Sequence, residues 1–137
     1  MNGEELIAAF ESGRTAADTF HHSDHVRLAF EYLCKYSPIE ALDKFSASLK
    51  GFAAAQGKAD RYHETITWAY LFLIRQRMAQ AGSAQTWEQF AGQNPDLLVW
   101  RPSLLERFYS RQTLDSDLAR KTFLFPDRVA SVPGGGD

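Results

Sequence analysis

The strongest constraint on the fold is an apolar stripe of helical period that follows Pro38. Large apolar side chains recur there every three or four residues, at Ile39, Leu42, Phe45, Leu49 and Phe52. This spacing matches the 3.6-residue turn of an α-helix and places the five side chains on one face. Ser37 as a cap and Pro38 at the first helical position favour the start of this helix, and Gly57 favours its end.

Two other long segments have a helical pattern. One helix is expected from His21 or His22 to about Tyr36, and a longer one from about Ala59 to Ala81, followed by Gly82. The middle of the longer segment, residues 66–74, is apolar on nearly every side, which is typical of a central buried helix. Shorter helices are expected over residues 1–12, 86–91, 102–109 and 116–122, with a loop over 94–102. The pattern predicts an all-α fold: a helical bundle of three main helices, additional short helices and an irregular C-terminal segment.

The size and charge of the chain limit the classes of function. Its 137 residues predict a single domain over residues 1–131, followed by a flexible, glycine-rich tail over 132–137. A net charge of −2 without a Lys/Arg-rich block argues against nucleic-acid binding. The apolar run at 66–74 is too short to span a bilayer, so no membrane association is expected. The lone Cys34 and an acidic N-terminus without signal-peptide features favour a cytoplasmic location.

The histidines cluster at the starts of two expected helices. Three of them lie within residues 20–25, and the fourth is His63. Residues three or four apart share a helix face, so His22 and His25 point the same way. The same spacing pairs Asp60 with His63, and His63 with Thr67. If the two helices pack side by side, three imidazoles and the Asp60 carboxylate converge near one end of the bundle.

One interpretation of this histidine cluster is a site for one divalent transition metal ion. Neutral imidazoles suit Zn, Fe, Ni or Cu, and three protein ligands plus an open position is the usual catalytic arrangement. His22, His25 and His63 are the candidate ligands. Glu64 is the candidate general base for a metal-bound water, and Asp24, like Asp60, is placed to orient an imidazole N–H group.

The H-x-x-H spacing is not specific for a metal, so two other interpretations stay open. A metal-free pocket for a small polar metabolite would use His63, paired with Asp24 or Asp60, as a general base. Tyr62, Trp68 and Tyr70 would then line the apolar part of that pocket. The third interpretation is structural, with the histidines capping helices inside a polar network. Whether the protein is an enzyme is left open by this pattern.

A non-enzymatic interaction or accessory protein is the alternative function. The segment Leu97–Trp100 is apolar throughout although it lies in an expected loop. Such a segment is suited to dock a protein partner or a second copy of the chain as a homodimer.

The two histidine segments also resemble the signatures of a family of small helical bacterial proteins without an assigned function. In that family an F-x-H-x-D-H segment begins one helix and Y-H-E-T-I-T begins a later one, as at residues 20–25 and 62–67 here. The C-terminal part, from Phe108 to Asp127, is similar to that family's ending, so the resemblance covers residues 20–127. It implies motif positions for six residues: His22, Asp24, His25, His63, Glu64 and Thr67. His21 falls on a variable position, and the family implies no activity.

Overall fold

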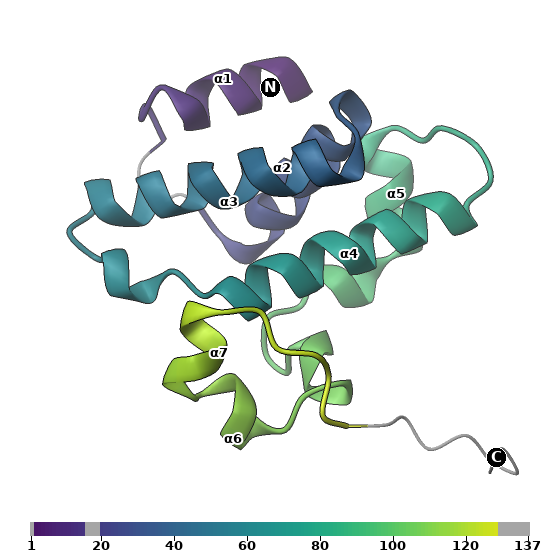
Figure 1. Cartoon of the computed structure of the whole chain (residues 1–137). Helices are drawn as coiled ribbons and strands as arrows, with labels where there is room; N and C mark the ends of the chain where they lie inside the picture. The colour runs from purple at the N-terminus through teal and green to yellow at the C-terminus, as the bar shows by residue number, and fades with distance from the viewer. Residues whose placement is uncertain (1, 16–19, 129–137) are drawn as a thin grey trace, which may run out of the picture.

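The prediction of an all-α fold is confirmed. The computed structural model of the chain describes residues 2–15 and 20–128, and these contain seven α-helices and no strand (Figure 1). The three longest helices are α2 (His22–Lys35), α3 (Pro38–Ala55) and α4 (Glu64–Gln80). The domain end at residue 131 and the tail over 132–137, both expected from the sequence, lie outside the described residues.

The three long helices pack together and the short elements cover them. Helix α2 contacts both α3 and α4, so its apolar side chains lie between these two neighbours. Helix α1 (Gly3–Glu11) packs on α2 and α3, and α6 and α7 lie beyond α4 on the side away from α1 (Figure 1). The remaining bounds are α5 Trp87–Gln93, α6 Arg111–Leu114, α7 Asp117–Lys121, and the 3-10 turns η2 Ala59–Arg61, η3 Pro95–Leu98 and η4 Leu104–Arg107.

Local capping explains where α2 and α3 begin. The backbone N–H of His21 donates to Asp24 Oδ2 at 2.9 Å, which satisfies a donor at the start of α2. Ser37 Oγ accepts from the Glu40 N–H, and Pro38 occupies the first helical position of α3. Gly57 follows α3 with a φ of 69°, a conformation that glycine adopts without strain. These boundaries confirm the predicted second and third helices.

The predicted start of the longest helix is wrong. Residues 59–61 form the separate turn η2, Tyr62 and His63 are extended, and α4 begins only at Glu64. The cause is the His63 side chain, whose Nδ1 accepts from the Ile66 N–H at 3.1 Å and so caps the helix. Asp60 therefore does not share a helix face with His63. The expected helix over residues 102–109 is likewise replaced by the shorter turn η4.

Helix α4 packs against α2, α3 and α7, as its apolar run suggests, but α2 is the more central helix, because it buries as many side chains over a shorter length. The buried side chains of α4 lie on more than one side: Thr65, Thr67, Ala69, Tyr70, Leu71 and Ile74. Thr65 Oγ1 donates to the Ala119 carbonyl at 2.7 Å and accepts from the Leu124 N–H at 3.1 Å. This hydroxyl joins the first turn of α4 to α7 and to the segment that follows it. In the described part of the chain, no helix combines the length and the apolarity needed to cross a membrane.

Candidate functional site

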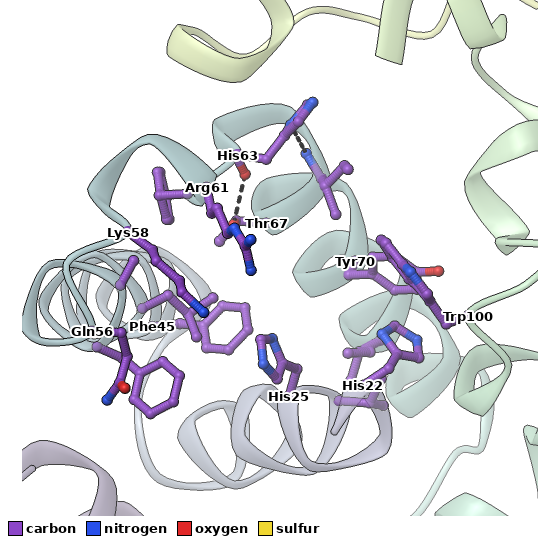
Figure 2. Close-up of a pocket in the computed structure, with 17 residues that line it drawn as sticks. His22, His25, Phe45, Gln56, Lys58, Arg61, His63, Thr67, Tyr70 and Trp100 are labelled. Carbon is purple, nitrogen blue, oxygen red and sulfur yellow. Dashed lines mark hydrogen bonds between the residues drawn. The ribbon is translucent and has the colours of Figure 1, made fainter. Parts of the chain in front are cut away.

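A cavity of about 520 Å³ lies between α2, α3 and α4, beside the turn that connects α3 to α4 (Figure 2). Apolar side chains from all three helices form most of its wall: Val26, Phe45, Leu49, Phe52, Ile66 and Ile74. Three of the four histidines, His22, His25 and His63, also line it. The three histidines that were predicted to cluster therefore surround a common cavity.

His25 extends from α2 into this cavity (Figure 2). Its ring packs against Phe20 with 4.5 Å between the ring centroids, and its nitrogens make no hydrogen bond to a described residue. Burial lowers the pKa of His25 to about 4, helped by the neighbouring His22 and opposed by Asp24. The imidazole is neutral at pH 7, so it offers a ligand one N–H donor and one nitrogen acceptor.

His22 stands beside His25 but one of its nitrogens is already bound. Its Nε2 donates to the Leu97 carbonyl at 2.9 Å, which fixes the tautomer because a carbonyl only accepts. The ring lies between Tyr70 and Trp100, with centroid distances of 4.9 and 5.0 Å. Burial lowers the pKa of His22, and the bond to Leu97 partly opposes this shift. His22 thus contributes a neutral aromatic ring to the wall of the cavity.

His63 contributes to the wall but directs its ring away from His25 (Figure 2). Its Nδ1 accepts from the Ile66 N–H, and its Nε2 donates to the Leu114 carbonyl at 2.8 Å. Burial lowers the pKa of His63, so the neutral Nε2–H tautomer matches both bonds. Both ring nitrogens are occupied by backbone groups, and a metal ion at His63 would have to displace one of them.

The three predicted carboxylates lie outside the residues that line the cavity. Asp24 accepts from the His21 N–H at the start of α2, and Asp60 is exposed on η2. Glu64 Oε1 accepts from the Tyr62 hydroxyl at 2.6 Å and from the Trp68 indole N–H at 3.0 Å. The predicted general base is therefore bound by two neutral donors, and Trp68 faces Glu64 and Phe123.

The hydroxyl groups around the cavity are also committed to protein partners. Thr67 Oγ1 donates to the His63 carbonyl at 2.8 Å, and Tyr70 shares a hydrogen bond with Ser103 at 2.8 Å. Burial raises the pKa of Tyr62, and its bond to Glu64 raises it further. Tyr62, Thr67 and Tyr70 consequently shape the wall and do not offer an ionised group.

Two cations that the sequence analysis did not select enter the cavity. Lys58 and Arg61 come from the connection between α3 and α4, and their charged ends point toward the interior opposite His25 (Figure 2). Periodicity could not reveal them, because the sequence suggested that residues 59–81 form one continuous helix. Gly57 was the only local sign that the chain turns here.

No group of three or more His, Cys, Asp or Glu side chains within residues 2–15 and 20–128 is arranged to hold a metal ion. The apolar segment Leu97–Trp100 is partly used inside the molecule. Leu97 is buried and Trp100 lines the cavity, whereas Val99 is 46% exposed.

Comparisons of the chain with protein-family models, curated proteins and solved structures find no match. The resemblance to the helical bacterial family stays a prediction.

Proposed function

We propose that this protein binds a small organic molecule in the cavity between α2, α3 and α4. The observation that carries the proposal is the cavity itself, whose volume of about 520 Å³ falls within the range of small-molecule sites. The sequence predicted a small polar metabolite. Walls formed by side chains such as Phe45, Leu49 and Ile74 favour a molecule with a larger apolar part, because this part is removed from water on binding.

His25 supports a ligand that also carries a polar group. The imidazole lies inside the cavity with no hydrogen bond to a described residue. Within the described residues no buried side-chain nitrogen or oxygen lacks a partner, so the His25 nitrogens are open to solvent in the cavity and accessible to a ligand. The neutral ring can donate to an oxygen of the ligand, which would orient the molecule within an otherwise apolar space.

Filling the cavity is expected to abolish binding. Ala53 lies on α3 and lines the cavity, so Ala53→Phe would occupy its volume without removing a core side chain. The probe is the neutral fluorophore N-phenyl-1-naphthylamine, whose emission rises in apolar surroundings. We expect saturable binding of one probe per native chain and no saturable binding to the Ala53→Phe variant.

Ala54→Phe is the matched control, because Ala54 is the next residue of α3 but is exposed to solvent. This variant should bind the probe as the native chain does, with an unchanged helical circular dichroism spectrum. Equal binding by the Ala53 and Ala54 variants would show that the probe lies elsewhere, and the proposed function would then be wrong.

A divalent metal ion held by His22, His25 and His63 remains a second proposal, with Zn, Fe, Ni or Cu as the candidates. Two imidazoles one turn apart on α2 line the cavity and support it. The bonds of His63 to backbone groups and the presence of Lys58 and Arg61 favour an organic ligand instead.

Elemental analysis of protein purified without an affinity tag distinguishes these two proposals. We expect less than stoichiometric metal in the native chain, with no change of the melting temperature on chelation. Stoichiometric metal that is lost in the His25→Ala variant would favour the metal proposal. Three further predictions from the sequence also stay predictions. They are the catalytic roles of Glu64 and Asp24, a homodimer through Leu97–Trp100, and a cytoplasmic location.

A further inference from the structure

The charged groups of the cavity indicate which class of molecule it accepts. On the basis of the proposed function, we infer that the ligand is an amphipathic organic anion. Its negative group, a carboxylate in the simplest case, lies between Lys58 and Arg61, and its apolar body extends toward Phe45, Leu49 and Ile74. Both cations come from one connection, residues 58–61, and no acidic side chain among the described lining residues opposes them.

The charge of the cavity wall is opposite in sign to that of the whole chain. The protein has 17 acidic and 15 basic residues and a net charge of −2. Among the described residues that line the cavity, however, there is no aspartate or glutamate, and the only permanent charges are those of Lys58 and Arg61. Two like charges at the mouth of an apolar space attract an anion and repel a metal cation.

Neither cation is neutralised by a residue that the structure describes. Within the described residues, the side chains of Lys58 and Arg61 make no ion pair and no hydrogen bond. The nearest acid in sequence is Asp60, whose exposed side chain does not line the cavity and whose carbonyl oxygen accepts from Arg120. Glu64 is bound to Tyr62 and Trp68, and its closest cation is Lys50 at 3.9 Å.

The positions of the polar groups fit a carboxylate with an apolar body. Lys58 and Arg61 enter from the connection, and His25 faces them from α2 (Figure 2). A guanidinium and an ammonium group both donate to carboxylate oxygens, and charge-assisted bonds of this kind are stronger than neutral ones. The neutral His25 ring can donate a further bond to the same group. The other described lining residues carry no permanent charge and are mostly apolar, although the Gln56 amide also lines the cavity. We therefore expect the remainder of the ligand to be uncharged.

A matched pair of ligands tests the charge directly. 1-Naphthylacetate and 1-naphthylacetamide have nearly the same size and shape, and only the first is an anion. Each is titrated against native protein carrying N-phenyl-1-naphthylamine, and displacement of the probe is followed by fluorescence. We expect the dissociation constant of the acetate to be about tenfold lower than that of the amide, as two partly exposed charge contacts would give. This ratio should decrease as salt is added, because salt screens exposed charges.

The Lys58→Gln/Arg61→Gln double variant should bring the ratio close to one while leaving binding of the neutral probe unchanged. The control is Arg75→Gln/Arg107→Gln, which removes the same charge at two exposed positions that do not line the cavity. This control should keep the tenfold ratio. The single variants Lys58→Gln and Arg61→Gln should each lose part of it, so the test does not depend on the folding of one protein.

The possible outcomes separate the two proposals. If the neutral probe binds and Ala53→Phe prevents it, but acetate and amide compete equally, the anion inference is wrong and the proposed function stands. If the control variant loses the preference as completely as the double variant does, the attraction comes from overall charge and the inference is again wrong. If neither the probe nor either competitor binds to the cavity, both proposals are overturned.

Discussion

Acidification from pH 7 to pH 4 is expected to remove about 3 kcal/mol from the free energy of unfolding through His25 alone. The pKa of His25 is about 4 in the folded chain, against 6.5 for a free histidine. Between these values the unfolded chain binds a proton that the folded chain does not bind. Unfolding is therefore favoured as the pH falls through this window. Above pH 6.5 the ring is largely neutral in both states, so the stability that is lost on acidification is present in full.

The burial of His25 and the charges near it explain the sign of this effect. Burial in the cavity wall is the largest cause of the low pKa, the neighbouring His22 acts in the same direction, and Asp24 opposes it. No acid among the described residues lines the cavity to stabilise the charged ring.

Urea unfolding of the native chain and of His25→Gln, at intervals between pH 7.5 and 4, measures this contribution. The variant cannot titrate at this position, so its stability should fall by about 3 kcal/mol less than that of the native chain over the same interval. His21→Gln is the control, because His21 is exposed before α2. Parallel pH curves for native and His25→Gln proteins would contradict the assignment of a buried neutral ring.

His63→Ala is expected to cost about 2 kcal/mol of stability in metal-free protein. The substitution removes the cap on the Ile66 N–H at the start of α4, which contributes about 1 kcal/mol in comparable helices. It also leaves the Leu114 carbonyl without its donor, at a similar cost. Helix α4 would thereby lose its first-turn cap and its attachment to α6.

His63→Asn separates the two contributions, because asparagine caps a helix well but is too short to reach Leu114. Its stability should lie between those of the native and His63→Ala proteins in urea unfolding at pH 7.5. Gln76→Ala, at an exposed position within α4, should change stability by less than about 0.5 kcal/mol. If His63→Ala were as stable as the native chain in a chelating buffer, the two bonds of His63 to backbone groups would not stabilise the fold.

The long helices were predictable because their signals are local. The apolar period after Pro38, the cap at Ser37 and the glycine at 57 all act within a few residues, and the structure has the helix that they predict. Only the first residue of the apolar stripe, Ile39, departs from the pattern, since it is 73% exposed. The start of α4 was not predictable from period alone, because residues 59–61 also fit a helical pattern. A single side chain, that of His63, decides the boundary through its bond to Ile66.

The cavity could not be predicted from any single segment, because its wall combines residues that are far apart in the sequence. The histidine pattern selected His22, His25 and His63, and the structure places all three in the same wall. Their difference in chemistry depends on distant partners: Leu97 and Leu114 bind two of the rings, and no described residue binds His25. The positions of Lys58 and Arg61 follow from the path of the connection between α3 and α4, where a helix was expected already from residue 59.

The cations of the cavity lie on a short connection, whereas its apolar wall belongs to the long helices. Lys58 and Arg61 are exposed and contribute no side chain to the hydrophobic core. Exchange of residues 58–61 can therefore alter the head group that is recognised while the scaffold keeps its stability. In a protein built this way, ligand preference can diverge among descendants much faster than architecture does.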